Sequence, residues 1–295
     1  MFVAVADVAF SGSRVMTSPD GIAWTSRTSA ANIYWNSVAW GGPTNAQVFV
    51  AVAFSGNGNR VMTSPDGSLW TSRSSASDNE WRSVAWGGPT NAQVFVAVAA
   101  SGAGNRVMTS PDGITWTTRT SAASNEWNSV AWGGPTNAQV FVAVATSGTG
   151  NRVMTSPDGL VWTIRTSAAD NFWRSVSWGG PANAQAFVAV GLSSTNNGVM
   201  TSPDGIAWTT RTSSASNQWN SVVWGGPATS AQVFVAVASS GTTGSNRVMT
   251  SPDGIVWTSR TSVADDWRSV AWGGPTNAQV FVAVSNSGTV MTSAI

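Results

Sequence analysis

The sequence predicts an all-β protein, a β-propeller built from four-stranded blades. Three observations lead to this prediction: a six-fold repeat of about 46 residues, four short strand-like segments per repeat, and no ten-residue stretch with helical apolar spacing. The repeat covers the whole chain, so we expect residues 1–295 to form one domain. The tetrapeptide Ser-Pro-Asp-Gly marks it at intervals of 46, 46, 46, 46 and 49 residues, starting at Ser18, Ser64, Ser110, Ser156, Ser202 and Ser251.

Each repeat holds four segments rich in Val, Phe, Trp and Thr, in a fixed order. We refer to them as segments A to D, which in one repeat are Trp81–Trp86, Val94–Val98, Arg106–Ser110 and Trp116–Thr120. They are short and bounded by Gly, Pro, Asn and Ser, as is typical of strands joined by turns. Helical solenoids share this repeat length, but the apolar spacing excludes them. Four antiparallel strands per repeat therefore predict a propeller blade.

The two most regular connections carry turn residues. In Ser-Pro-Asp-Gly, between segments C and D, proline sets φ, aspartate bonds local amides and glycine supplies a positive φ. Gly-Gly-Pro follows segment A. The longest interval comes from insertions in GGPATSAQ and SSGTTGSNR, which read as loops, where extra residues cost little.

The strand count is compatible with two blade numbers. The chain starts with a B segment, Phe2–Val5, ends after a C segment, Val290–Ser293, and carries six A, seven B, seven C and six D segments. We predict six blades, in which the last A segment, Trp267–Trp272, joins strands from the N-terminus and closes the ring. One B–C pair, from residues 1–18 or 280–293, is then spare and offers an edge for a homo-oligomer. The alternative is seven blades, of which the first lacks its innermost strand.

The composition excludes many kinds of chemistry. Only 9% of the residues are charged, with 14 Arg, 13 acidic residues and no Lys, His or Cys. Disulfides, Cys/His metal sites and thiolate or Ser–His nucleophiles are therefore absent. A net charge of +1 argues against nucleic acid and acidic membranes as partners. No apolar run approaches the ~20 residues of a membrane helix, and we see no signal peptide.

The Ser-Pro-Asp-Gly-x-x-Trp segment resembles the Asp-box of sialidase-type propellers, Ser-x-Asp-x-Gly-x-x-Trp. Ser18, Asp20, Gly21 and Trp24 keep the order of that motif, with one residue fewer between Asp and Gly. The longer phrase, SPDGxxWTxRTS followed by WxSVAW, resembles tandem repeats of phage, large DNA virus and aquatic bacterial proteins, and it spans nearly the whole chain. This resemblance implies a propeller and a virion or extracellular setting, and it leaves the activity open.

Six aspartates occupy the same position of identical turns. A ring of acid catalysts or calcium ligands is one interpretation. However, a carboxylate before Gly in a tight turn bonds local amides, and the turn lacks the alternating carboxylates of a calcium loop. We therefore expect no metal or cofactor and assign a structural turn role to Asp20, Asp66, Asp112, Asp158, Asp204 and Asp253.

The sequence has few side chains that could catalyse a reaction. Sialidase catalysis needs an activated tyrosine, an acid and an arginine cluster, and the sequence has one Tyr, Tyr34, and two Glu. Glu80 and Glu126 occupy equivalent positions of adjacent repeats and do not form a pair that flanks one substrate. With so few general acid–base groups, we predict that the protein is not an enzyme.

The residue after the first tryptophan of segment A alternates between Asn and Arg. On six blades this alternation gives an approximate three-fold pattern. One interpretation is that three guanidinium groups lie near the mouth of the axial channel, where they can hold an anion or an acidic sugar. The other explanation of the alternation is duplication of a two-blade unit. The preceding tryptophans either pack in the core or offer rings to a ligand. The candidate ligand-binding residues are Trp35, Trp81, Arg82, Trp127, Trp173, Arg174, Trp219, Trp267 and Arg268.

Variation between the repeats indicates which face of the disc binds. The A–B and C–D turns barely change, whereas the B–C and D–A loops differ and share the opposite face. We predict a non-enzymatic, lectin-like adhesion module on a virion or extracellular surface that binds a host glycan or a protein receptor. The alternatives are an architectural component that assembles with other virion proteins and a designed or reconstructed repeat protein without a ligand.

Overall fold

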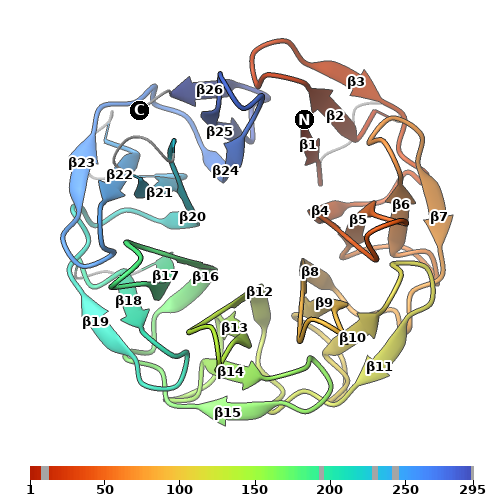
Figure 1. Cartoon of the computed structure of the whole chain (residues 1–295), viewed down its shortest axis with the longest axis horizontal. Helices are drawn as coiled ribbons and strands as arrows, with labels where there is room; N and C mark the ends of the chain where they lie inside the picture. Colours follow the sequence, from red (N-terminus) through yellow and green to blue (C-terminus); the bar gives the residue numbers. More distant parts are fainter. Residues whose placement is uncertain (8–12, 193–195, 228–231, 241–245, 294–295) are drawn as a thin grey trace.

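The chain forms a ring of seven antiparallel sheets around a central axis (Figure 1). The computed structural model describes residues 1–7, 13–192, 196–227, 232–240 and 246–293. The predicted all-β propeller is confirmed, but the expected six blades are wrong, because the number of sheets is seven. No helix long and apolar enough to cross a membrane occurs within the described ranges.

Five sheets contain four strands, with strand A nearest the axis and strand D outermost. The A strands are β4 (Trp35–Gly41), β8 (Trp81–Gly87), β12 (Trp127–Gly133), β16 (Phe172–Gly179), β20 (Trp219–Gly225) and β24 (Trp267–Gly273). The B strands are β1 (Phe2–Val5), β5 (Val48–Ala53), β9 (Val94–Ala99), β13 (Val140–Ala145), β17 (Ala186–Leu192), β21 (Val233–Ala238) and β25 (Val280–Ser285). The C strands are β2 (Val15–Ser18), β6 (Val61–Ser64), β10 (Val107–Ser110), β14 (Val153–Ser156), β18 (Val199–Ser202), β22 (Val248–Ser251) and β26 (Val290–Ser293). The D strands are β3 (Thr25–Arg27), β7 (Thr71–Arg73), β11 (Thr117–Arg119), β15 (Thr163–Arg165), β19 (Thr209–Arg211) and β23 (Thr258–Arg260).

The first and last blades are incomplete. In the described residues the first consists of β1, β2 and β3 without an A strand, whereas the last consists of β24, β25 and β26 without a D strand. The predicted pairing of the last A segment with N-terminal strands is therefore wrong. The physical reason is burial: a spare hairpin exposes its apolar side chains, whereas as a seventh blade it leaves Phe2 and Val15 only 7% and 3% exposed.

The two incomplete blades meet by packing and not by a shared sheet. The turn after β2 lies against β25, so closely that a Cβ added at Gly21 would lie 2.6 Å from Cγ2 of Val282. Gly21 has a φ of +83°, which a residue with a side chain rarely adopts. The glycine of this turn thus allows both the turn and the contact that closes the ring.

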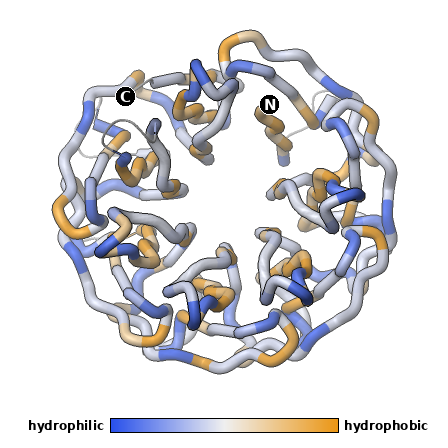
Figure 2. The backbone as a smooth tube through the Cα atoms, in the orientation of Figure 1, coloured by the Kyte–Doolittle hydropathy of each residue, from blue (hydrophilic) through white to orange (hydrophobic). Residues whose placement is uncertain are grey.

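The hydrophobic core consists of layers between neighbouring blades. One layer joins Val50 and Val52 of β5 to Trp81, Phe95 and Met108 of the next blade, all of them fully buried. Equivalent layers recur around the ring. Figure 2 shows the apolar residues concentrated in the middle strands of each blade. Each blade is therefore stabilised mainly by its neighbours, as expected for a repeat architecture.

Candidate functional site

Every A strand carries a β-bulge directly after its first tryptophan. In β8 the register against β9 shifts between Trp81 and Ser83, and the same shift occurs in the other five A strands. The bulged residue is the one that alternates between Asn and Arg. Because a bulge takes its residue out of the ladder, it can redirect that side chain. This explains locally how the alternating position reaches the axis.

The bulged residues meet at one cavity of about 660 Å³. All seven blades contribute to its wall, so the cavity lies on the axis. Glu126 from a D–A loop and Thr146 and Asn286 from B–C loops also line it, which confirms that these loops share one face. The six bulged residues in its wall are Asn36, Arg82, Asn128, Arg174, Asn220 and Arg268.

The three arginines do not form the approximate three-fold pattern expected for six blades. They belong to the third, fifth and seventh blades, and the first blade contributes no bulge because it has no A strand. The cavity also holds two carboxylates, Asp7 and Glu126. The sequence pattern did not single out Asp7, although its position two residues after the first B segment was a usable signal. The result is an asymmetric cavity with an uneven charge distribution.

Arg82 is already paired. Its Nη2 atom lies 2.8 Å from Oε2 of Glu80, and its Cζ atom lies 5.0 Å from the centre of the Phe54 ring. Its Nε atom is buried and has no hydrogen-bond partner among the described residues. Since Glu80 neutralises this guanidinium locally, Arg82 contributes less positive charge to the cavity than the other two arginines.

Arg174 and Arg268 form the positive side of the cavity. Arg174 donates from Nη1 to Oδ1 of Asn220 at 2.6 Å, and Asn220 donates from Nδ2 to the Trp267 carbonyl at 2.8 Å. Burial, and then the neighbouring charge of Arg268, lowers the pKa of Arg174. Neither arginine has an ion pair in the described part of the chain. Two guanidinium groups that line one cavity and form no ion pair are a suitable arrangement for an anion.

A small polar network occupies another part of the wall. Thr146 donates from Oγ1 to Oε2 of Glu126 at 3.0 Å, and Asn128 donates from Nδ2 to the same Thr146 oxygen at 3.0 Å. Amide and hydroxyl groups of this kind donate and accept hydrogen bonds, as the hydroxyl groups of a sugar require. Glu126 gives this side a negative charge, in contrast to the side with Arg174.

The six tryptophans before the bulges belong to the core. They are at most 1% exposed, and each Nε1 donates to a backbone carbonyl four residues earlier, as Trp81 does to Ser77 at 3.0 Å. Only the first of them contributes to the cavity wall. Because their rings are buried, these tryptophans have little surface to offer a ligand, and a role in ligand binding stays a prediction for Trp35, Trp81, Trp127, Trp173, Trp219 and Trp267.

The loops that differ most between repeats include residues 8–12, 193–195 and 241–245, which lie outside the described residues. The inserted segment 228–231 also lies outside them. The candidate site therefore consists of the three arginines and the polar residues beside them, and ligand binding by this site stays a prediction.

The repeated aspartates make contacts inside their own turns. Asp112 accepts bonds at Oδ1 from the backbone N–H groups of Ile114 and Thr115, at 2.8 and 3.0 Å, and from the Ser110 hydroxyl at 3.0 Å. Partial burial raises the pKa of Asp112, but these bonds outweigh it and the net pKa is lowered. In the described residues no group of three or more acidic, His or Cys side chains could hold a metal ion.

Replacing Asp112 with alanine is expected to lower the free energy of unfolding by about 1–2 kcal/mol, because two turn N–H groups lose their acceptor. The loss should depend on pH. A carboxylate whose pKa is lowered by folding stabilises the protein above its ordinary value of 3.8, and this contribution disappears as the pH falls through the lowered pKa. In thermal melts, the melting temperature of the variant should therefore differ strongly from that of the wild type at about pH 7 and only slightly at about pH 2.5. Asp112→Asn, which keeps an acceptor oxygen, is the control, and a pH-independent difference would contradict the explanation.

Seven radial sheets around an axial cavity define the protein as a seven-bladed β-propeller. Among solved structures the fold is similar to a streptogramin B lyase, with a TM-score of 0.62 and 7% identity over 100% of this chain and 87% of the other. It is also similar to BBS1N in complex with ARL6DN, with a TM-score of 0.63 and 9% identity over 99% and 95% of the two chains. A third similar structure is a catalytically inactive virginiamycin B lyase from Staphylococcus aureus with quinupristin, with a TM-score of 0.60 and 9% identity over 88% and 84%.

Identities this low show the fold alone. The three structures include enzymes and a protein in complex with a partner, so the fold is compatible with catalysis and with binding. The sequence matches no protein-family profile and no curated protein.

Proposed function

We propose that the protein is a non-enzymatic interaction module whose axial cavity binds an acidic, hydroxyl-rich ligand such as a host glycan or a receptor glycan, in a virion or extracellular setting. The observation that carries this proposal is the pair Arg174 and Arg268, which line the axial cavity and form no ion pair in the described part of the chain. A guanidinium group forms paired hydrogen bonds with a carboxylate or sulfate group. The setting rests on the resemblance of the repeat to viral and bacterial propellers.

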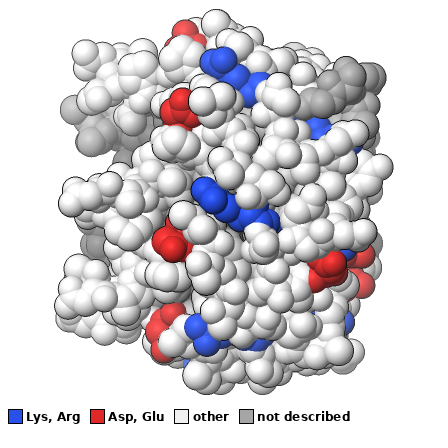
Figure 3. Space-filling model, turned by 90° about the vertical axis from the view of Figure 1, so that its right-hand side faces the viewer, with Lys and Arg blue, Asp and Glu red and all other residues white. Residues whose placement is uncertain are grey.

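The surroundings of the arginines suit a sugar. Asn36, Asn128 and Thr146 line the same cavity and supply amide and hydroxyl groups for ring hydroxyls. On the outer side of the molecule, Figure 3 shows arginine and acidic side chains scattered among uncharged residues. The chain has no His or Cys to act as a nucleophile or its base, which favours binding over catalysis.

The triple replacement of Arg82, Arg174 and Arg268 by asparagine tests this function. The fold should survive, because asparagine occupies the equivalent bulges at Asn36 and Asn128. We expect the wild-type protein to bind sialylated or sulfated oligosaccharides on a glycan array. The variant should bind the same oligosaccharides at least about tenfold more weakly, since charged hydrogen bonds contribute roughly 1.5–3 kcal/mol each.

A matched control variant loses the same number of positive charges, but away from the axial cavity. Arg27, Arg73 and Arg119 lie on outer D strands, where each Nε donates to a threonine of strand C at 2.9–3.0 Å. Their triple replacement by asparagine should leave glycan binding unchanged. Equal binding by the axial variant and the wild type would contradict the proposal, as would a wild-type protein that binds no acidic glycan.

An architectural role is the second candidate, and one observation favours it. The turns between strands C and D carry exposed aliphatic side chains on the face opposite the cavity. Ile22, Leu69, Val161 and Val256 are 75%, 77%, 71% and 66% exposed. A ring of exposed apolar residues is a feature of surfaces that contact other proteins. Sedimentation at increasing protein concentration tests this role, because replacing these four residues with serine should reduce any self-association.

A further inference from the structure

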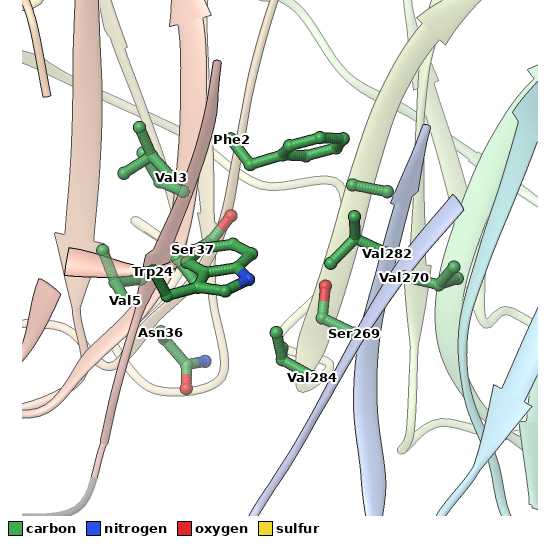
Figure 4. A pocket seen from close by; sticks show the side chains of 13 residues that line it. Phe2, Val3, Val5, Trp24, Asn36, Ser37, Ser269, Val270, Val282 and Val284 are labelled. Atoms are coloured by element: carbon green, nitrogen blue, oxygen red, sulfur yellow. The ribbon is translucent and has the colours of Figure 1, made fainter. Parts of the chain in front are cut away.

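The position of the missing A strand in the first blade is an open cavity of about 290 Å³. One wall is β1, with Val3 and Val5, and β4 adjoins it with Ser37 and Val38. The facing wall comes from the last blade and includes Ser269 (Figure 4). Because β1 pairs with β2 alone among the described strands, no described strand lies along its inner edge. An unpaired edge beside an apolar cavity is the arrangement that accepts an added β-strand.

The hydrogen bonds between neighbouring A strands identify what the cavity lacks. The serine in the middle of each A strand accepts a bond from the valine N–H of the next A strand, as Ser83 does from Val130 at 3.2 Å. Five such bonds run from β4 to β24. The series stops on both sides of the cavity: no bond of this kind is found among the described residues for the Ser269 hydroxyl or the Val38 N–H. Both groups line the cavity.

The packing of tryptophan rings on glycines of the neighbouring A strand is interrupted at the same place. The second tryptophan of an A strand packs on the last glycine of the preceding A strand, as Trp178 does on Gly133. Gly273 has no such tryptophan, and its nearest neighbour is instead Phe2, with Cε1 3.3 Å from an added Cβ. On the other side, Trp40 has no preceding glycine to cover it and is 45% exposed, whereas its equivalents in the later blades are partly buried. An added strand with the pattern Trp-x-Ser-Val-x-Trp-Gly would pack its second tryptophan on Gly273 and offer its glycine to the ring of Trp40.

The last blade has a matching vacancy on its outer side. A cavity of about 460 Å³ lies beside β26, with Met291, Thr292 and Ser293 in its wall. In the complete blades a threonine of strand C accepts a bond from the D-strand arginine, as Thr109 does from Arg119 at 2.9 Å. Thr292 is the equivalent threonine, and the last blade has no D strand to supply that arginine.

One continuous segment of polypeptide would occupy both vacant positions. In every repeat, the D strand of one blade continues through a short loop into the A strand of the next blade, as β11 continues into β12. The last and first blades are adjacent in the ring (Figure 1). We infer that this surface binds one extended peptide segment with the repeat's own D–A pattern, Trp-Thr-x-Arg-Thr followed by Trp-x-Ser-Val-x-Trp-Gly. Its first half pairs with β26 and its second half pairs with β1.

A synthetic peptide with the sequence of residues 116–133 is the probe. We label it with fluorescein, because the 18 tryptophans of the protein obscure tryptophan emission. Anisotropy should show saturable binding to the full chain with one site and a Kd that is roughly micromolar or tighter. In the peptide, Trp132→Ala should weaken binding by about 100-fold, because the ring that covers Gly273 is lost. Ser129→Ala should weaken it by about fivefold through loss of the acceptor for Val38.

One substitution in the protein separates the site from the fold. Gly273→Ala leaves the free protein nearly unchanged, since the added Cβ meets only Phe2 at 3.3 Å. In the complex the same Cβ overlaps the peptide's Trp132 ring, so binding should weaken by about tenfold or more. The melting temperature of the free variant should stay at the wild-type value, and the complex with the wild type should melt at a higher temperature than the free protein.

Attaching the segment covalently to the protein tests the same site without depending on the solubility of the peptide. The sequence of residues 111–133 placed after Ser293 should raise the melting temperature and prevent binding of the free peptide, whereas a Gly/Ser extension of equal length should do neither. The inference is overturned if neither the peptide nor the extension binds, or if Gly273→Ala binds the peptide as the wild type does. It is also overturned if the cavity is filled by a second copy of this chain, seen as a concentration-dependent dimer that Gly273→Ala dissociates.

Discussion

Trp173→Ala is expected to lower the free energy of unfolding by about 3–5 kcal/mol, the range for removing a large aromatic side chain from a core. Trp173 is fully buried in the layer between two blades, among Val142, Val153 and Phe187. Its Nε1 atom also donates to the Ala169 carbonyl at 3.0 Å. The substitution therefore leaves a cavity and an unpaired carbonyl group. Chemical denaturation with tryptophan fluorescence and circular dichroism measures the loss.

Trp40→Ala is the matched control. It removes the same side chain from the inner strand β4, where the ring is 45% exposed beside the missing strand. We expect a loss of about 1 kcal/mol, because much of this ring already contacts solvent. Equal losses for the two variants would show that the layers between blades do not carry the stability of the ring.

Gly133→Ala is expected to have the second largest effect, a loss of about 1–3 kcal/mol from overpacking. A Cβ at position 133 would overlap the ring of Trp178 in the next A strand, and neither strand can retreat without disturbing its own sheet. A change from Gly to Ala normally stabilises a protein slightly by reducing the freedom of the unfolded chain, so a net loss here reports the clash.

Gly273→Ala supplies the comparison for this prediction. It makes the same chemical change at the equivalent position of the last A strand, where Phe2 replaces the tryptophan. We expect thermal melting of this variant to match the wild type within about 0.5 kcal/mol of stability. If the two glycine variants were equally destabilised, the cause would lie in the backbone of the strand and not in the contact between blades.

The candidate site was only partly accessible from the sequence. The Asn/Arg alternation was visible, and it identified Arg82, Arg174 and Arg268 before any geometry was known. What differs among them depends partly on a neighbour in the chain, Glu80, and partly on contacts between blades. Glu80 pairs with Arg82, whereas Arg174 lies near Arg268 from another blade, and only the folded ring brings these two charges together. The choice between core and ligand platform for Trp81 was also open until its burial was known.

The amino-acid sequence by itself determined the strand order within each blade and the chemistry of the turns. These features are local: Ser110, Asp112 and Gly113 meet within four residues, and consecutive strands pair with short connections. Only the tertiary structure decided that the blades number seven and that the first and last remain incomplete. The physical reason is that the blade number follows from the angle between neighbouring blades. That angle is set by side chains from different repeats, such as Trp178 on Gly133, which no single repeat contains.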